Sequence, residues 1–397
     1  MLTSARRAAV ILAAAAALPA SLLLGGGTAA TASPQPAAHA PHYQARVILN
    51  GAHLRHTFFP AGKKKARTEA LSSPDDITVL GHIFTAFQNG VGPQGQPSPD
   101  GNTDSTVVEF TDSGRVVRQW DLRGKCDGIT ADTAKHLLIA TVNEDAHSSV
   151  YTITPGAAPG HQVLHYRYDI PLPHNGGTDA ISIWDGRVLL SASAPGTIGK
   201  PAPQPTYPAV YSVTFDRATM VARVKPLFFD EAEATIANTG KDYGKKVRLA
   251  LTDPDSNEDV PASGPRFAHD FMVTSQGDKE QIFSAPGGKL AVLRLTQSVD
   301  DTAWARSPRG QLVGASTAGD TIDVVTGPFP AKSIFVAVTP CDAGNAPATC
   351  PGPGFPPNYL GQLNPWTGVI TKVDVRGPAF GPQGLVFIGP GWNVLPG

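Results

Sequence analysis

A strand–turn–strand unit opened by an acidic residue recurs along most of this chain. Its fullest copy is residues 126–153, CDGITADTAKHLLIATVNEDAHSSVYTI, in which three apolar-alternating strands are separated by polar turns. Alternation with a period of two is the mark of half-buried β-strands. Successive copies lie roughly 50 residues apart in the first half of the chain. The residues that open the copies are Asp76, Asp127, Asp179, Asp270 and Asp301.

Four-stranded units at this period are typical of a β-propeller, because one unit cannot bury both of its faces alone. Helical periodicity is almost absent, since the 41 Gly and 37 Pro interrupt nearly every window. We therefore predict an all-β chain: a β-propeller of six or seven four-stranded antiparallel blades over residues 74–397. A pair of β-sandwiches is the structural alternative. Closure of the ring is expected to pair residues 384–388 with strands near 76–87.

The blade count depends on residues 230–267, which have no clear strand alternation. An inserted loop or hairpin is the favoured interpretation, and a degenerate blade is the alternative. Residues 33–73 contain an Ala/Pro/His-rich start and the basic run Lys63–Lys65. We predict a flexible N-terminal linker there.

The N-terminus has the pattern of a secretory signal peptide. Arg6 and Arg7 precede an apolar run, and Ala30-Thr31-Ala32 supplies the small residues that a signal peptidase requires. We predict cleavage after Ala32 and a secreted, extracellular protein; a retained membrane anchor is the alternative.

Export makes disulfides possible. Cys341 and Cys350 lie close together in a Gly/Pro-rich segment, and we predict a local disulfide between them. Such a bridge would stabilise the fold by roughly 2–3 kcal/mol. Cys126, at a strand start, is expected to be a buried free thiol.

The charge balance bounds the partners. The formal net charge is −1 and charged residues make up 16% of the chain. Nothing in this balance favours nucleic acid or an anionic membrane as a partner. We expect a monomer that binds a small molecule or an extracellular or cell-wall partner.

Residues 126–142 and 299–315 share a cadence in which an acid opens one strand and a polar turn leads to an apolar strand. In this they resemble the β-propeller repeats of the NHL, YncE-like and gluconolactonase-type lactonase group, over most of residues 75–389. The resemblance implies, for the lactonases, a divalent metal on the propeller axis held by Glu, Asn and Asp. Here no Glu opens the first unit, where Asp75 and Asp76 stand, so the activity is not carried over residue by residue.

The innermost strand of each blade lines the axis, so residues at equivalent strand entries converge there. We predict an axial ligand-binding mouth that also includes two histidines, and Gln383 as a further candidate. Its residues are Asp76, Asp127, His174, Asp179, His269, Asp270 and Asp301. Oxygen ligands at this density suit Ca²⁺ or another divalent metal, with Asp127, Asp179 and Asp301 as the metal ligands. The competing interpretation is that each Asp accepts backbone N–H bonds in a turn.

Two further polar clusters and five tryptophans are present in the sequence. Asn143-Glu144-Asp145 follows the second strand of the fullest unit, and only this cluster or Asp127 is expected at the mouth. TDPDSNED, residues 252–259, begins like a calcium loop but lacks the Gly and Glu that an EF-hand requires. The five tryptophans are expected to pack between blades. They are Trp120, Trp184, Trp304, Trp366 and Trp392.

No nucleophile elbow, zinc-protease motif or phosphate-binding loop occurs in the sequence. Two functions remain open. The first is a secreted propeller that binds a ligand or partner through one face. The second is a metal-dependent hydrolase of the lactonase type, in which an axial metal activates water against a small lactone or ester. In that case Asp127 or Asp179 would be ligands, and His174 or Asp301 the base.

Overall fold

The computed structural model describes residues 42–173, 177–193, 207–340 and 358–390, and nearly all of its regular structure is β-strand. The described part contains two short 3-10 turns, η1 (Gly51–His53) and η3 (Thr317–Gly319). None of the helices in these residues is long and apolar enough to cross a membrane. A compact unit extends from Pro41 to Gly397; the predicted signal peptide lies outside the described residues.

Two four-stranded antiparallel meanders come first in this unit, and we name each sheet by its first strand. The β4 sheet contains β4 (Pro74–Leu80), β5 (His82–Phe87), β6 (Asp104–Phe110) and β7 (Val116–Arg123). The β8 sheet contains β8 (Cys126–Asp132), β9 (Leu137–Val142), β10 (Ser149–Ile153) and β11 (Val163–Tyr168). Both match the strand order that the sequence units predict.

The next two sheets extend the same plan. The β12 sheet contains β12 (Ile181–Trp184), β13 (Arg187–Ser191), β14 (Pro208–Asp216) and β15 (Val221–Phe229), and a short parallel pairing joins β15 to β11. The β18 sheet contains β18 (Pro254–Asp259), β19 (Phe271–Ser275), β20 (Glu280–Ser284) and β21 (Leu290–Arg294). A hairpin of β16 (Glu233–Ile236) and β17 (Lys246–Arg248) extends its outer edge.

In the last two sheets the strands do not follow one another in chain order. The β22 sheet contains β22 (Val299–Trp304), β25 (Ile334–Val338), β26 (Tyr359–Leu363) and β27 (Ile370–Lys372). Between β22 and β25 the chain leaves to form β23 (Gln311–Ser316) and β24 (Thr321–Thr326), which belong to the neighbouring sheet. That sheet, the β29 sheet, has the order β29 (Leu385–Ile388), β23, β24, β1 (Tyr43–Asn50) and β28 (Val375–Arg376). Both ends of the described chain therefore meet in one sheet.

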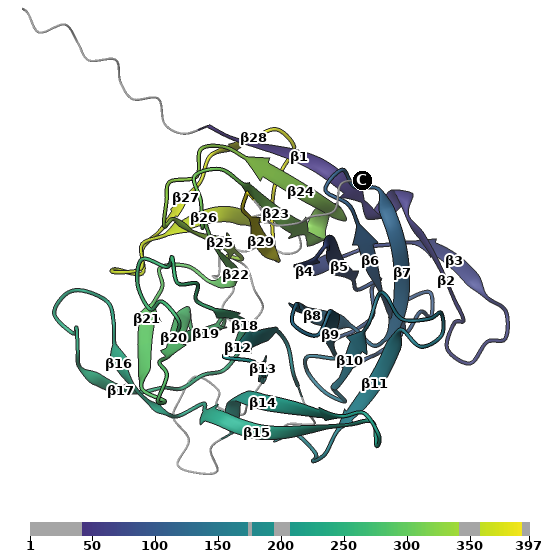
Figure 1. Ribbon diagram of the computed structural model, residues 1–397, viewed down its shortest axis with the longest axis horizontal. Coiled ribbons are helices and arrows are strands. Elements are labelled where there is room, and N and C mark those ends of the chain that lie inside the picture. Colours follow the sequence, from purple (N-terminus) through teal and green to yellow (C-terminus); the bar gives the residue numbers. More distant parts are fainter. Residues whose placement is uncertain (1–41, 174–176, 194–206, 341–357, 391–397) are drawn as a thin grey trace, which may run out of the picture. The chain divides into compact units, whose positions relative to one another are not determined.

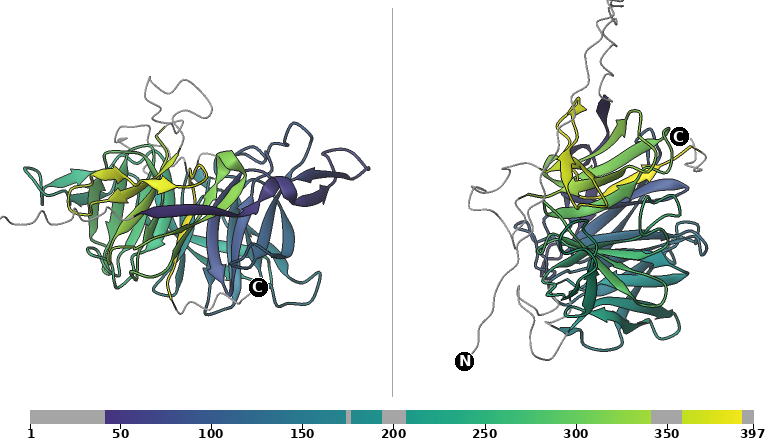
Figure 2. Two further views of the ribbon diagram at one scale, coloured as in Figure 1. Left: turned by 90° about the horizontal axis from the view of Figure 1, so that it is seen from above. Right: turned by 90° about the vertical axis from the view of Figure 1, so that its left-hand side faces the viewer.

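Within this unit the sheets stand around a common axis, with β4, β8, β12, β18, β22 and β29 nearest the centre (Figure 1). The side views in Figure 2 show the sheets on edge and the hairpin of β2 (Arg55–Phe58) and β3 (Arg67–Ala70) projecting outward. This arrangement is that of a β-propeller.

The core lies between neighbouring sheets as separate apolar layers. In β9, Leu138, Ala140 and Val142 pack toward the β4 sheet, while Ile139 packs toward the β12 sheet. Alternate residues of a strand point to opposite faces, so each sheet can contribute to two layers. The described residues form six such clusters, and one of them joins the β29 sheet to the β4 sheet. The ring of layers is thus continuous.

The structure differs from the sequence predictions at three places. Residues 43–50, assigned to a flexible linker, form β1, whose Ala45 and Leu49 are buried in two core layers. Residues 230–267 contain the predicted hairpin, but also β18, the innermost strand of its sheet. Residues 385–388 pair with β23 rather than with strands near 76–87, although Gly384 N donates to Asp75 O at the junction with the β4 sheet.

Candidate functional site

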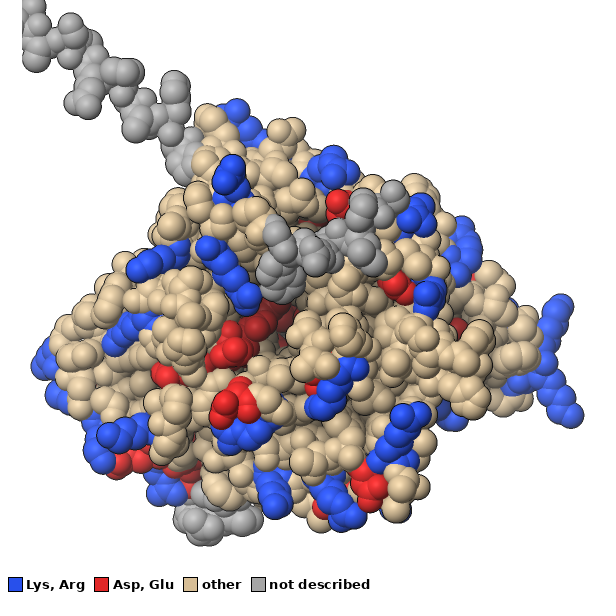
Figure 3. All heavy atoms as spheres, viewed as in Figure 1, with Lys and Arg blue, Asp and Glu red and all other residues tan. Residues whose placement is uncertain are grey.

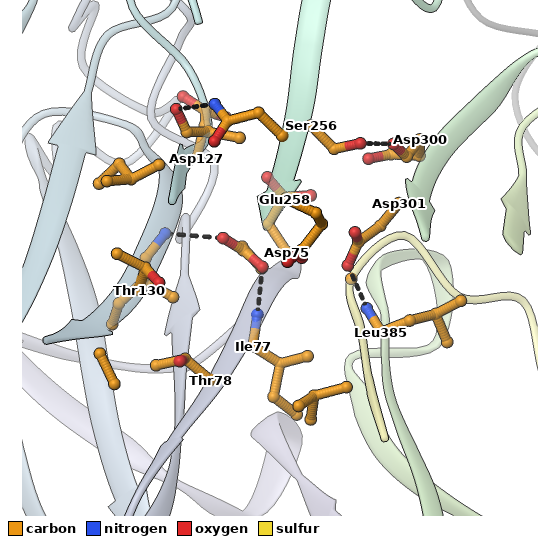
Figure 4. Close-up of a pocket in the computed structure, with 18 of the residues that line it drawn as sticks. Asp75, Ile77, Thr78, Asp127, Thr130, Ser256, Glu258, Asp300, Asp301 and Leu385 are labelled. Carbon is orange, nitrogen blue, oxygen red and sulfur yellow. Dashed lines mark hydrogen bonds between the residues drawn. The ribbon is translucent and has the colours of Figure 1, made fainter. Parts of the chain in front are cut away.

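A cavity of about 190 Å³ opens on the axis where the inner strands begin (Figure 4). On the face seen in Figure 3, acidic side chains gather in the central hollow. Eight of the residues that line the cavity are acidic, and Arg306 is the basic one among them. The acidic lining residues are Asp75, Asp76, Asp127, Asp179, Asp255, Glu258, Asp300 and Asp301.

The same backbone irregularity places an Asp at the cavity in several sheets. In β4 the register with β5 shifts between Pro74 and Ile77, so Asp75 and Asp76 occupy a bulge. Equivalent shifts occur in β8, β18 and β22. Bulges re-aim side chains and are frequent beside functional sites. Before β12 the backbone bonds of Asp179 and Ser191 place Asp179 at the matching position.

We call the first residues of these bulges the axial acid ring. Its members come from five neighbouring inner strands: Asp75, Asp127, Asp179, Asp255 and Asp300. At the corresponding position of the β29 sheet, Gln383 donates its N–H to Ala315, and Ala315 donates to Gly384. The candidate Gln383 thus occupies the matching backbone position, but it does not line the cavity.

The second bulge residues bridge neighbouring inner strands. Asp76 accepts from Ile77 N at 2.6 Å and, across the sheet boundary, from Ile129 N at 2.8 Å. Asp301 accepts from Thr302 N and from Leu385 N of the β29 sheet, both at 2.6 Å (Figure 4). We call Asp76 and Asp301 the bridging acids. The structure therefore shows Asp76 and Asp301 as acceptors of backbone N–H bonds, which is the competing interpretation for these two predicted site residues.

Where the second bulge residue is glycine, neighbouring backbones touch. A Cβ on Gly128 would lie 2.5 Å from Asp179 O and 2.8 Å from Ala180 Cα. One on Gly384 would lie 2.4 Å from Asp75 O, to which Gly384 N donates at 3.2 Å. The inner strands therefore form a closely packed collar beneath the acid ring.

The ring acids repel one another in a site with little water. Burial is the main cause that raises the pKa of Asp75, Asp127, Asp179 and Asp255 well above the ordinary carboxyl value, and neighbouring carboxylates add to it. Lys125 offsets part of this charge, because its Nζ lies 2.7 Å from Asp127 Oδ1 and also pairs with Glu144. Gln88 Nε2 donates to Asp75 at 3.0 Å and to Asp127 at 2.8 Å. Negative charge still exceeds positive charge in the cavity lining.

Deeper in the cavity the bridging acids meet Glu258. Burial and the nearby Asp76 raise the pKa of Glu258 to about 8, and Arg306 lowers it in part. Burial raises the pKa of Asp76 to about 7, although its two backbone donors favour the charged form. These groups exchange protons near neutral pH.

Two buried acceptors that line the cavity have no hydrogen-bond partner. Asp127 is 2% exposed and its Oδ2 has no donor; Asn257 is 3% exposed and its Oδ1 has none, while its Nδ2 donates to Ala180 O at 2.7 Å. Buried polar atoms are nearly always paired, and leaving one unpaired costs about 1–3 kcal/mol. Both atoms are thus unpaired acceptors buried in the wall of the cavity.

Four of the predicted mouth residues meet at this cavity: Asp76, Asp127, Asp179 and Asp301. His269 and Asp270 do not line it; they lie in the connection from β18 to β19, where His269 O accepts from Trp184 Nε1. His174 lies outside the described residues. The prediction of His269 and Asp270 depends on residues 271–275 forming an inner strand, whereas that strand, β19, is second in its sheet.

The sequence did not predict that Asp75, Asp255, Glu258 and Asp300 lie at the axial mouth. A Pro-Asp pair opens both β4 and β18, and that shared signal could have identified Asp75 and Asp255. Of the two alternatives for the mouth, Asp127 lines the cavity and the cluster at residues 143–145 does not, although the start of β8 and the end of β9 lie at the same end of an antiparallel pair. Lys125 joins the two through Glu144.

The predicted metal ligands Asp127, Asp179 and Asp301 supply oxygen donors of the kind that Ca²⁺ takes. In the described residues, however, no group of three or more His, Cys, Asp or Glu is arranged to hold a metal ion. A divalent cation at this site stays a prediction. Cys126 is confirmed as a buried free thiol, and Cys341 and Cys350 lie outside the described residues.

No protein-family model matches this sequence, and no curated protein matches it. Among solved structures, the chain is similar to the Nidogen/Laminin complex, with a TM-score of 0.46, 8% identity, and 87% of this chain and 98% of that chain covered. It is also similar to a putative gluconolactonase, with a TM-score of 0.41, 11% identity, and coverage of 88% and 86%. For virginiamycin B lyase from Staphylococcus aureus these values are 0.40, 10%, 85% and 96%.

Proposed function

We propose that this protein is a six-bladed propeller that binds a small cationic ligand in the axial cavity. Six blades are supported by the six apolar layers between sheets and by the six inner strands around the axis. The observation that carries the function is the axial acid ring, whose five carboxyl groups gather at one cavity. A ligand with positive charge would relieve the repulsion among them.

The size of the cavity bounds the ligand. About 190 Å³ holds a few waters or one small molecule, and is smaller than most drug-sized pockets. An organic amine fits this chemistry because each ammonium group donates up to three hydrogen bonds to carboxylates. A hydrated Ca²⁺ or another divalent cation is the second ligand type that oxygen donors support.

The hydrolase alternative rests on the deeper part of the same cavity. Glu258 and Asp76, with pKa values of about 8 and 7, could donate or accept a proton near neutral pH. This reaction class would act on a small lactone or ester with a divalent metal bound. We place it second because Asp76 already accepts two backbone bonds.

Thermal unfolding and calorimetric titration test the binding proposal. The probes are CaCl₂, spermidine and putrescine, each added to EDTA-treated full-length protein, followed by a lactone and ester panel for turnover. The test variant is Asp179→Asn/Asp255→Asn. The matched control is Asp112→Asn/Asp374→Asn, which removes the same charge from exposed positions outside the cavity.

We expect at least one cation to raise the melting temperature of the natural protein and of the control, with about a tenfold weaker affinity in the test variant. A rise that is equal in both variants would show screening of net charge instead of a site. No response to any of the three probes would overturn the proposal, and turnover that requires a metal would favour the hydrolase.

Export is a further part of the proposal. We propose that the protein acts outside the cell as a monomer after cleavage following Ala32. The mass of the N-terminal peptide of protein recovered from culture medium checks the cleavage, and recovery only in the cell pellet would contradict it.

A further inference from the structure

A second, more open cavity of about 410 Å³ lies away from the axis, against β26 and the turn that follows it. Trp366 lines it and is 49% exposed, and Val369 beside it is 46% exposed. The expectation that every tryptophan packs between blades is met by Trp120, Trp184 and Trp304, which are buried, but it is wrong for Trp366. Trp392 lies outside the described residues. The exposed indole therefore needs another explanation.

The turn that carries Trp366 is held rigidly. Asn364 Oδ1 accepts from Trp366 N at 2.9 Å and from Thr367 N at 3.2 Å. From the β18 sheet, Thr239 N donates to Trp366 O at 2.7 Å and Asn238 Nδ2 donates to Thr367 O at 2.7 Å. The backbone carbonyl groups of Trp366 and Thr367 are thus held by hydrogen bonds from another segment.

A cationic side chain also packs against the indole and is itself held in place. The Arg266 guanidinium lies 4.8 Å from the centre of the Trp366 ring. It is held there by bonds to Pro365 O and Ala237 O, each 2.8 Å long. Cation–π contacts of this kind hold an aromatic side chain in one orientation. An exposed ring that is already ordered loses little conformational entropy when a ligand covers it.

The rest of the lining is half polar and half apolar, and among the described residues it contains no acidic residue. Gln362 and Asn364 are exposed amides beside the ring, Ser333 and Thr371 add hydroxyls, and Lys332 adds a positive charge. An aromatic platform flanked by amide and hydroxyl groups matches a ligand with a flat apolar face and a rim of hydroxyls. Saccharide rings have that chemistry.

We propose that this groove, the Trp366 groove, binds a saccharide chain. A sugar ring stacks on Trp366, and Gln362 and Asn364 bind its hydroxyls. Nothing in this assignment depends on the axial cavity, because none of the residues that line one cavity lines the other.

Affinity electrophoresis and calorimetry with cellohexaose, chitohexaose and hexagalacturonate test the groove. The variants are Trp366→Ala, Trp366→Phe, Gln362→Ala and the control Phe59→Ala, which removes another exposed aromatic residue, 64% exposed, on a different part of the chain. We expect at least one oligosaccharide to bind and to lose about tenfold in affinity with Trp366→Ala. Trp366→Phe should retain part of the affinity, and Phe59→Ala all of it.

Three results would overturn the assignment: no oligosaccharide of the panel binds; binding is unchanged in both Trp366→Ala and Gln362→Ala; or Phe59→Ala weakens it equally. Circular dichroism checks that each variant is folded, and Trp366→Phe keeps the ring if Trp366→Ala does not fold. Asp179→Asn/Asp255→Asn should bind saccharide normally, which separates this site from the proposed cation site.

Discussion

Asp75 and Asp76 are neighbours in sequence, yet they belong to two different regions of the axial cavity. Asp75 is in the axial acid ring, where its carboxylate accepts from Gln88, which also donates to Asp127. Asp76 is a bridging acid whose two oxygens accept backbone N–H groups from two different sheets. The pair Asp300 and Asp301 repeats this division in β22. One bulge thus places a ligand-type carboxylate and a structural carboxylate side by side.

The difference shows what each region contributes. The bridging acids and the small bulge residues hold the inner strands together, so changes to them should act on stability. The ring acids add repulsion to the folded state, which a cation would relieve, so changes to them should act on binding. Variants in either region can test this division between stability and binding.

The largest effect is expected for Gly128→Ala. Its Cβ would lie within 2.8 Å of backbone atoms of the next inner strand, and backbone cannot move aside as a flexible side chain can. We expect a loss of about 3 kcal/mol in the free energy of unfolding, measured by urea denaturation. Gly156→Ala is the control, since nothing lies within 4 Å of its Cβ position. Equal stabilities of the two variants would show that the collar is not tightly packed.

A smaller loss is expected for Asp301→Ala. It leaves two buried backbone N–H groups, of Thr302 and Leu385, without acceptors, at roughly 1–3 kcal/mol each, and removal of a buried carboxylate offsets part of that. We expect a net loss of about 2 kcal/mol by urea denaturation. Asp301→Asn, which keeps one acceptor oxygen, should lose less. If Asp301→Ala abolished the cation response with stability unchanged, Asp301 would be a ligand and the division into two regions would fail.

The sequence predicted the propeller and half of the cavity's acids, because period-two alternation survives in nearly every inner strand. It could not distinguish Asp75 from Asp76, or Asp300 from Asp301. A bulge sets both residues opposite one partner residue, so alternation no longer determines which side chain faces the axis.

The β18 strand was missed for a different reason. Its residues PDSNED face the cavity and a neighbouring strand, with Asn257 and Ser256 bonded to Ala180 and Asp300, so the strand lacks apolar alternation. The apolar residues of β19 favour that strand as the inner one instead. For this reason the sequence predicts Asp270, which directly precedes β19, as a mouth residue. The exchange of β23 and β24 into the β29 sheet has no local signal, since it depends on which sheet edge is open.

The smallest effect is expected from pH. The ring acids Asp179 and Asp255, and Glu258 and Asp76, have pKa values above those of the unfolded chain. Between the unfolded value near 4 and about 8 the folded protein therefore holds more protons, and its stability falls as pH rises. We expect a melting temperature lower at pH 8 than at pH 5 by on the order of a few degrees.

Asp179→Asn/Asp255→Asn should flatten this dependence, because two of the groups that hold extra protons are removed. Asp112→Asn/Asp374→Asn should leave it unchanged, since both residues are exposed. A bound cation should flatten it as well, by favouring the charged carboxylates that repel one another without it. A melting temperature that rises from pH 5 to pH 8 would mean that the ring acids are already stabilised in their charged form, which would remove the electrostatic reason for a cationic ligand.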